Sequence, residues 1–375
     1  MMKKILILGG YGNFGKRVVE QLADIHNTEL FICGRSEQRA QELIKTLPQA
    51  NAKLTALALD IHSDALVHFV QQQRPFLVIH TAGPFQAQPH QVPQLCARYG
   101  SHYIDLADDR RFVCDISRLN RQAAEQHCLI VSGASSVPGL SSAVISHYHK
   151  QFACIEDIDI AIAPGNRAER GEATLRGILS YTGHPIRVFS GGRETVRYGW
   201  MSPRKLNFGG RIGQRHLANV DVPDLELFPG CYQVQRSVTF QAGLELPWLH
   251  YTMVAMAWLA RLKLVKNWAP LTPAIFRLSE RLRQLGSDRG AMRIAITGKN
   301  STGQPHQLSW TLYAENGVGP YIPTLSAIIL ARKLINDEPL PSGAMPCLKL
   351  FSLDELQPHF DRLGIYYHVQ SNTPS

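Results

Sequence analysis

The stretch Ile5-Leu6-Ile7-Leu8-Gly9-Gly10-Tyr11-Gly12-Asn13-Phe14-Gly15 decides the fold of the first part of the chain. Its four apolar residues predict a buried strand that runs directly into a Gly-x-Gly-x-x-Gly pattern, and a helix is expected to open at Phe14. This order is typical of a dinucleotide-binding βαβ unit, because glycine lets the backbone approach a pyrophosphate while the N–H groups of the helix N-terminus face the anion. A glycine turn without a ligand is the alternative. The residues predicted to contact the cofactor here are Gly10, Tyr11, Gly12, Asn13, Phe14 and Gly15.

Short apolar runs recur regularly through residues 1–145 and alternate with polar-apolar stretches of helical length. Such alternation predicts a parallel sheet with helices on both faces. Six runs favour the doubly wound strand order 3-2-1-4-5-6 of a Rossmann fold. The runs are Ile5–Leu8, Leu30–Cys33, Leu54–Leu59, Leu77–Ile79, Tyr103–Leu106 and Leu129–Val131.

The pattern changes near residue 150, where Ile158, Ile160 and Ile162 alternate with more polar residues as in a half-buried strand. Further strands and two helical stretches predict an inserted α+β domain with an antiparallel sheet. A helical run at Ile322–Ile335 is placed back on the first domain. The predicted organisation is a Rossmann domain over 1–145, a substrate and dimerisation domain over 146–318, and C-terminal helices over 319–375 that return to the Rossmann domain.

The end of the second strand, Cys33-Gly34-Arg35-Ser36, distinguishes between two cofactors. A carboxylate at this place would bond the ribose 2′-OH of NAD, whereas Arg35 can pair with the 2′-phosphate of NADP and Ser36 can donate a hydrogen bond to it. The sequence therefore favours NADP over NAD. Other strand ends face the same cleft, so Asp60 is expected beside the adenine. The segment Thr81-Ala82-Gly83-Pro84-Phe85 is expected along the ribose and nicotinamide, with Ala82, Gly83 and Pro84 as the contacts.

Composition limits the class of protein. The chain has 375 residues, of which 45% are hydrophobic and 18% charged, as in a globular protein of two domains. Its net charge of +9 suits acidic ligands and is too modest to indicate nucleic-acid binding. Seven cysteines without CxxC spacing indicate reduced thiols in the cytoplasm, and no metal site is expected.

The longest apolar stretch, Trp248–Leu264, is interrupted by His250 and Arg261 and is too short to span a bilayer. A buried amphipathic helix is the favoured interpretation, and a membrane-surface helix is the alternative.

A family resemblance rests on the glycine loop together with Ala82-Gly83-Pro84-Phe85, Tyr103-Ile104-Asp105-Leu106 and Val137-Pro138-Gly139-Leu140. In combination these segments resemble the saccharopine dehydrogenase-like family, most closely its bacterial branch. The resemblance implies a Rossmann domain with an inserted α+β domain, and an NAD(P)-dependent oxidoreductase acting at C–N bonds of amino-acid derivatives. An acidic residue usually precedes the Pro-Gly in the saccharopine-processing enzymes, and Val137 stands there instead. This departure argues against saccharopine itself as the substrate. Some relatives are proposed to reduce C=C bonds of lipid-like substrates, so the resemblance does not fix the substrate class.

The second domain is rich in arginine between residues 167 and 215, which suits a carboxylate-bearing substrate. The alternative is a solvated basic face, or bonding within and between subunits. Arg167 and Arg193 are the substrate-binding candidates. Hydride transfer also needs a proton donor or acceptor. The candidates for it are Asp105, Asp108, Tyr103, Tyr181, His184 and Tyr198.

These observations predict an NADP-dependent oxidoreductase for a small acidic or amino-acid-derived substrate, working as a homodimer. The alternatives are an NADP-binding sensor or scaffold without turnover, associated with a membrane surface, and an enoyl reductase for a lipid-like substrate.

Overall fold

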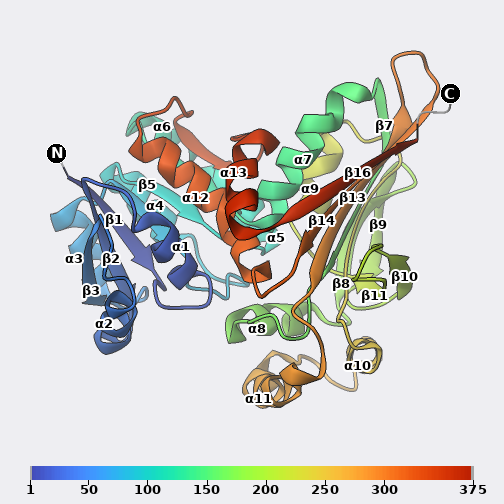
Figure 1. Ribbon diagram of the computed structural model, residues 1–375, viewed down its shortest axis with the longest axis horizontal. Coiled ribbons are helices and arrows are strands. Elements are labelled where there is room, and N and C mark those ends of the chain that lie inside the picture. The colour runs from blue at the N-terminus through green and yellow to red at the C-terminus, as the bar shows by residue number, and fades with distance from the viewer. Residues whose placement is uncertain (1, 373–375) are drawn as a thin grey trace. The chain divides into compact units, whose positions relative to one another are not determined.

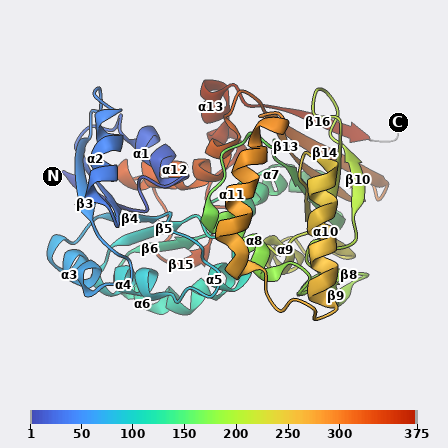
Figure 2. The same ribbon diagram turned by 90° about the horizontal axis from the view of Figure 1, so that it is seen from below.

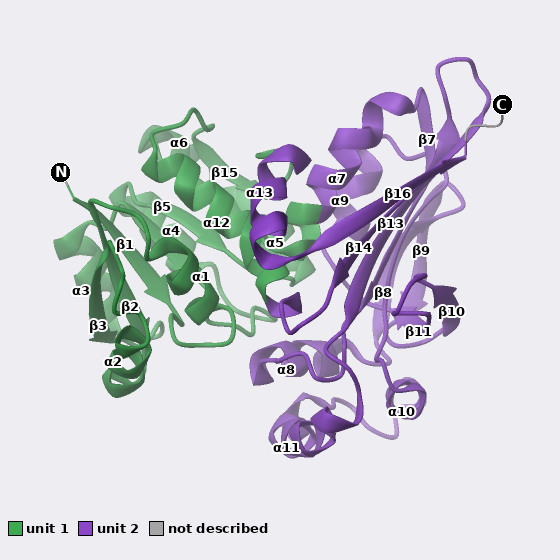
Figure 3. Ribbon diagram, viewed as in Figure 1, with its two compact units in different colours: residues 1–140, 321–351 green, residues 141–320, 352–375 purple. Residues whose placement is uncertain are grey.

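The computed structural model describes residues 2–372 and divides into two compact units (Figures 1 and 3). Unit 1 comprises residues 1–140 and 321–351, and unit 2 comprises residues 141–320 and 352–375. The chain thus leaves unit 1 after residue 140 and returns to it for residues 321–351. Each unit has its own sheet.

Unit 1 is built on a parallel sheet of seven strands in the order β15-β6-β5-β4-β1-β2-β3. The predicted order 3-2-1-4-5-6 is confirmed, and β15 adds a strand beside β6 that the sequence analysis did not predict. The strands are β1 (Lys3–Leu8), β2 (Thr28–Gly34), β3 (Lys53–Ala58), β4 (Leu77–His80), β5 (His102–Asp105), β6 (Leu129–Ser132) and β15 (Gly343–Pro346).

Helices cover both faces of this sheet, as the continuous apolar runs require. Figure 2 shows α1, α2 and α12 on one face and α3, α4 and α6 on the other. All four side chains of Ile5–Leu8 are fully buried between these layers. The helices are α1 (Gly15–Leu22), α2 (Glu37–Lys45), α3 (Asp64–Gln73), α4 (Gln91–Tyr99), α5 (Arg110–Cys114), α6 (Asn120–Glu125) and α12 (Ile322–Ile335).

Unit 2 is built on a mixed sheet of nine strands, in which β10-β11-β12-β7-β13-β14-β16 form a continuous row. A hairpin of β8 and β9 joins this sheet at β12, where Ser190 pairs with Ser237. The strands are β7 (Cys154–Ala163), β8 (Pro185–Ser190), β9 (Arg193–Tyr198), β10 (Arg204–Asn207), β11 (Gln214–Asn219), β12 (Ser237–Ala242), β13 (Gly290–Lys299), β14 (Pro305–Ala314) and β16 (Tyr366–Asn372).

The predicted fold class is confirmed, with one correction to the second sheet. It is not purely antiparallel, because β12 runs parallel to β7 in the register Ser237↔Asp157. The connection between β7 and β12 spans residues 164–236, which is long enough for the crossover that parallel pairing needs and a tight hairpin cannot provide. The helices of unit 2 are α7 (Ser141–Tyr148), α8 (Glu172–Tyr181), α9 (Asp224–Cys231), α10 (Pro247–Arg261), α11 (Thr272–Leu282) and α13 (Leu353–Leu363).

The C-terminal region differs from the expected helices over 319–375. Helix α12 and β15 belong to unit 1, whereas α13 and β16 belong to unit 2. Strand β16 is held there by antiparallel pairing with β14, in which Val369 lies opposite Trp310. Among the described residues, no helix combines the length and the apolar character that crossing a bilayer requires.

Candidate functional site

The loop between β1 and α1 has a shape that only glycine permits. Gly9 adopts a φ of +75°, in the left-handed region. A Cβ on Gly15 would lie 2.1 Å from the carbonyl oxygen of Gly9, and one on Gly12 would lie 3.0 Å from the same oxygen. The glycines therefore let the loop fold closely against the start of the helix.

The same loop presents unpaired backbone donors. Helix α1 begins at Gly15, one residue later than expected, and Phe14 is its N-cap without a side-chain cap. Within the described part of the chain, the N–H groups of Asn13, Phe14 and Gly15 have no protein acceptor. Free N–H groups at a helix N-terminus favour an anion, so the loop fits a pyrophosphate.

Tyr11 connects this loop to the end of β2. Its hydroxyl accepts a hydrogen bond from the backbone N–H of Ser36 at 2.8 Å. A Cβ on Gly34 would lie 2.4 Å from the Tyr11 ring, so glycine is required where the ring crosses the strand end. Arg39 covers the ring from α2, with its guanidinium carbon 4.9 Å from the ring centroid. These contacts hold the turn that carries Arg35 beside the glycine loop.

Arg35 itself is exposed and has no hydrogen-bond or ion-pair partner among the described residues. Ser36 is the N-cap of α2 and accepts a hydrogen bond from Arg39 N–H, as its position in the sequence predicted. A free cation at a helix N-terminus is electrostatically unfavourable without an anion nearby. The position of Arg35 therefore fits a phosphate-bearing ligand.

The loop after β4 forms a third wall of this site. Thr81 donates a hydrogen bond from its hydroxyl to the carbonyl oxygen of Leu8 at 2.8 Å and lies 3.1 Å from that of Gly9. Ala82, Gly83 and Pro84 follow, partly exposed, with a cis peptide bond between Gly83 and Pro84. Because β1 lies between β2 and β4, this is the switch point of the sheet, where such folds bind ligands.

Asp60 has a local role beyond the end of β3. It is exposed, and its carboxylate accepts a hydrogen bond from the backbone N–H of His62 at 3.0 Å. This turn precedes α3. No contact in the structure tests the expectation that Asp60 lies beside an adenine.

Asp105 is fully buried at the end of β5. One carboxylate oxygen, Oδ1, accepts hydrogen bonds from Ala107 N–H at 2.9 Å, Gly133 N–H at 2.8 Å and the Ser132 hydroxyl at 3.0 Å. Burial raises the pKa of Asp105 to about 6, although these donors oppose the shift. The carboxylate thus ties the ends of β5 and β6 together.

The buried neighbours of Asp105 also face inward. The hydroxyl of Tyr103 lies 3.0 Å from Nδ1 of His80, and both residues are fully buried. Burial lowers the pKa of His80 to about 3 and raises that of Tyr103. Asp105 and Tyr103, predicted as proton-transfer candidates, are therefore enclosed in the core. They lie beneath the loops that follow β4, β5 and β6, which we call the rim of the site.

Asp108 is the candidate of unit 1 that reaches the rim. It is half-buried beyond β5, and Gln86 donates a hydrogen bond to its carboxylate at 3.2 Å from the loop after β4. Burial, the main cause, raises the pKa of Asp108, and the charge of Asp109 adds to the shift. A carboxyl group with a raised pKa holds its proton closer to neutral pH, as a general acid must.

The candidates in unit 2 are spread over different places. Tyr181 ends α8, and its carbonyl oxygen accepts a hydrogen bond from His184 N–H at 3.0 Å. Arg193 begins β9 in the hairpin that joins the sheet near Asp157, whereas Arg167 lies beyond Ala163 at the other end of β7. Six strand residues separate these ends by about 20 Å. The structure therefore does not bring Arg167 and Arg193 together.

Many other arginines of the basic stretch have partners within unit 2. Arg204 bonds both carboxylate oxygens of Asp159, at 2.6 and 2.8 Å. Arg187 and Arg211 lie within 4 Å of Glu194 and Glu315. This part of the stretch serves internal ion pairing, as the alternative to substrate binding predicted.

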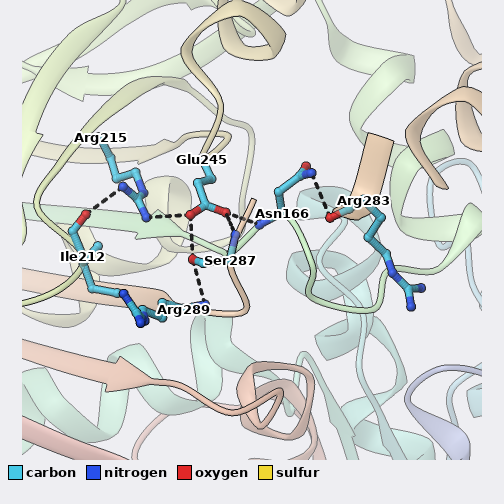
Figure 4. A network of polar contacts seen from close by, with 7 residues as sticks. All are labelled: Asn166, Ile212, Arg215, Glu245, Arg283, Ser287 and Arg289. Carbon is cyan, nitrogen blue, oxygen red and sulfur yellow. Dashed lines mark hydrogen bonds and ion pairs between the residues drawn. The ribbon is translucent and has the colours of Figure 1, made fainter. Parts of the chain in front are cut away.

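Glu245 is the centre of a polar network at the loops beyond β7 (Figure 4). Its carboxylate accepts hydrogen bonds from Asn166 N–H at 2.7 Å and Ser287 N–H at 2.8 Å, from the Ser287 hydroxyl at 2.6 Å, and from Arg215 at 3.3 Å. Asn166 in turn donates to the carbonyl oxygen of Leu282 at 2.8 Å. The loop that carries Arg167 is thereby fixed, and Arg167 N–H bonds Ser287 O at 2.8 Å.

We expect Glu245→Gln to lower the free energy of unfolding by about 2–4 kcal/mol, because either orientation of the amide turns an NH2 group toward buried donors. The side chains of Glu245 and Arg215 are only 12% and 11% exposed. Urea denaturation measures the loss. Glu194→Gln is the matched control, since its ion pair with Arg187 is exposed and is worth at most about 0.5 kcal/mol. An equal, small effect of both changes would contradict the role given to Glu245.

Two residues of the site were not singled out from the sequence. Gly34 and Arg39 shape the contact with Tyr11. The one signal for this contact in the sequence was Gly34 itself, a glycine directly after the predicted strand Leu30–Cys33. The described residues hold no group of three or more His, Cys, Asp or Glu side chains placed to bind a metal ion.

Comparisons with known proteins agree with this geometry. Residues 5–131 match the family described as the saccharopine dehydrogenase NADP binding domain. The fold is similar to that of saccharopine dehydrogenase (L-Glu forming) from Saccharomyces cerevisiae, with 13% identity, a TM-score of 0.70, and coverage of 99% of this chain and 100% of that one. Amine dehydrogenase from Mycobacterium smegmatis is also similar, with 9% identity, a TM-score of 0.47, and coverage of 92% and 94%. No curated protein matches the sequence.

Proposed function

We propose that this chain, a saccharopine dehydrogenase-like NAD(P)-dependent oxidoreductase, uses NADP to transfer hydride to or from a small acidic or amino-acid-derived substrate at a C–N bond. The match of residues 5–131 to the family described as the saccharopine dehydrogenase NADP binding domain confirms the predicted resemblance for this part of the chain and supports an oxidoreductase. The observation that carries the cofactor proposal is the partnerless, exposed Arg35 beside the glycine loop. The C–N reaction is proposed from the family resemblance and from the saccharopine dehydrogenase that shares the fold.

The residues of unit 1 fit a dinucleotide. The N–H groups of Asn13, Phe14 and Gly15 would hold the pyrophosphate, and Arg35 with Ser36 would hold the 2′-phosphate. The loop 82–84 would line the nicotinamide side of the site. When bound, the cofactor supplies or accepts the hydride.

Asp108 is the proton-transfer residue that we propose for unit 1. Its half-buried place at the rim leaves the carboxyl group within reach of a ligand, unlike Asp105, and its raised pKa suits a group that holds a proton. The acidic character of the substrate is proposed from the arginines of unit 2 that have no partner among the described residues, of which Arg193 is one. We further propose that the protein acts as a homodimer in the cytoplasm.

Calorimetric titration with NADPH and NADH tests the cofactor proposal. We expect NADPH to bind at least about tenfold more tightly than NADH, since Arg35 would form a charge-assisted bond to the 2′-phosphate. Arg35→Ala is expected to weaken NADPH about tenfold or more and to leave NADH within about threefold.

Lys45→Ala provides the control, because Lys45 is an exposed cation in the last turn of the same helix, α2. It should change neither affinity. Equal binding of both nucleotides by the wild type would overturn the NADP preference, and no binding of either at millimolar concentration would overturn the oxidoreductase proposal.

A further inference from the structure

Exposed apolar side chains are concentrated in one segment of unit 2. Nine of the 13 exposed large hydrophobic residues in the described chain lie between residues 248 and 285, and they are 39% to 70% exposed. Single exposed apolar residues are common on soluble proteins, whereas a concentration of them marks an interaction site. The nine are Trp248, Tyr251, Trp258, Leu259, Leu262, Leu264, Leu271, Leu278 and Leu285.

Helix α10 carries apolar residues both on its buried side and on its exposed side. One side, including Met253 and Ala257, is buried in unit 2. The other presents Trp248, Tyr251 and Trp258 at helical spacing. The sequence favoured a buried helix here, and the structure corrects this expectation for the outer half of α10.

Helix α11 continues the same kind of surface. Leu271, Leu278 and Leu285 recur every seven residues from just before the helix to just after it, and so they fall along one line. Figure 1 shows α10 and α11 end-on and next to each other, and Figure 2 shows them lengthwise and side by side. The two helix axes thus lie along one surface of unit 2.

The charges of this surface are mainly positive, since Glu280 is the one acidic residue between 248 and 285 and lies 2.9 Å from Arg283. No aspartate or glutamate occurs from Leu246 to Ser279, a stretch that contains Arg261, Lys263, Lys266 and Arg277. All four basic residues are exposed. We call the exposed side chains of residues 248–285 the α10–α11 face.

We propose that the α10–α11 face docks on an anionic lipid bilayer. Interfacial helices combine tryptophan and leucine on an exposed side with lysine and arginine, and each basic residue near an anionic surface adds to the attraction. A second copy of this chain fits less well, because pairing through this face would bring the same positive charges together. The inference does not depend on nucleotide binding.

Flotation of the full chain with lipid vesicles tests the proposal without nucleotide. We expect the protein to float with vesicles of phosphatidylcholine and phosphatidylglycerol at low salt, and much less with phosphatidylcholine alone. Raising the salt to about 0.5 M should weaken the binding, because the Debye length then falls below about 5 Å.

Two double variants separate the apolar and the electrostatic parts. Leu262→Glu with Leu278→Glu should lower the partition coefficient about tenfold or more. Lys263→Gln with Lys266→Gln should reduce the salt dependence by about half, because Arg261 and Arg277 keep their charges. Val196→Glu, at a 55% exposed position of β9, is the control and should float like the wild type. Circular dichroism melts verify that each variant is folded.

Failure of the wild type to float at low salt would overturn the proposal, as would flotation of the Leu262→Glu, Leu278→Glu variant at the wild-type level. Light scattering without lipid provides a further check. A dimer that this variant dissociates would show that the face joins two copies of the chain instead.

Discussion

Gly15→Ala is expected to weaken NADPH binding about 100-fold or more, because the loop must change shape to accept a single methyl group. The new Cβ would lie 2.1 Å from the carbonyl oxygen of Gly9 and 2.8 Å from the Cα of Gly10. Both are backbone atoms, so no flexible side chain can move aside. Separating them shifts the N–H groups of Asn13 and Phe14 away from the position where they would meet a pyrophosphate. Calorimetric titration measures the loss.

Gly230→Ala is the matched control for this change. Gly230 lies in α9, and a Cβ there would meet nothing within 4 Å. Alanine should leave NADPH affinity unchanged and, as a better helix former, leave stability equal or slightly higher.

A milder variant keeps the test decisive if Gly15→Ala does not fold. A Cβ on Gly12 would lie 3.0 Å from Gly9 O, so a small shift of the loop accommodates it. We expect Gly12→Ala to fold and to bind NADPH about tenfold more weakly. A folded Gly15→Ala protein with wild-type affinity would mean that the loop is a turn without a ligand.

The fold of unit 1 could be predicted because its signals are local. Each central strand is buried on both faces, so it appears in the sequence as a continuous apolar run such as Ile5–Leu8. Strand β15 lacks this signal, since Gly343-Ala344-Met345-Pro346 contains a glycine, a proline and no β-branched residue. Its place beside β6 depends on pairing with residues far away in the sequence.

The fold of unit 2 was less predictable, because more of its strand pairing depends on residues far apart in the sequence. Strand β16 is an edge strand with mostly exposed side chains, and its polar sequence gives no clear alternation. Whether β12 lies parallel or antiparallel to β7 depends on the path of the whole intervening chain. Helix α10 was recognised from its apolar content, but its exposed half was not, because composition does not say which side is covered.

Some residues of the candidate site could also be predicted from local sequence, and others could not. The glycine loop and Arg35 could be predicted because both lie at strand ends within one βαβ unit. The contact of Tyr11 with Gly34 and Ser36 is specific to this chain and depends on a side-chain direction. Asp105 was predicted as a proton-transfer candidate from its place at a strand end, yet its side chain turns into the core.

Asp105→Asn is expected to change how stability depends on pH. The folded protein raises the pKa of Asp105 from an ordinary value of 3.8 to about 6, chiefly by burial. Between these two pH values the folded state binds more protons than the unfolded state, so this carboxyl group stabilises the fold less as the pH rises. Its contribution is fully present below about pH 3.8 and is lost as the pH rises through about 6. Two pKa units correspond to about 3 kcal/mol.

Asparagine keeps the size of the side chain and can present its amide oxygen to Ala107 N–H, Gly133 N–H and the Ser132 hydroxyl. It does not titrate. The unfolding free energy of the wild type minus that of Asp105→Asn should therefore fall by about 2–3 kcal/mol between pH 4 and pH 7.5. Urea denaturation over this range measures the difference, in which the titrations of all other groups largely cancel.

Asp64→Asn controls for the loss of a carboxylate at the surface, since Asp64 is exposed in the first turn of α3. Its difference curve should stay within about 0.5 kcal/mol over the same range. A difference for Asp105 that rises with pH would show that the three donors stabilise the ionised carboxylate more than burial destabilises it.

NADPH affinity shows whether Asp105 contacts the nucleotide or only holds the surrounding loops. Asp105→Asn should bind NADPH within about threefold of the wild type, because the enclosed carboxylate acts on the site only through the ends of β5 and β6.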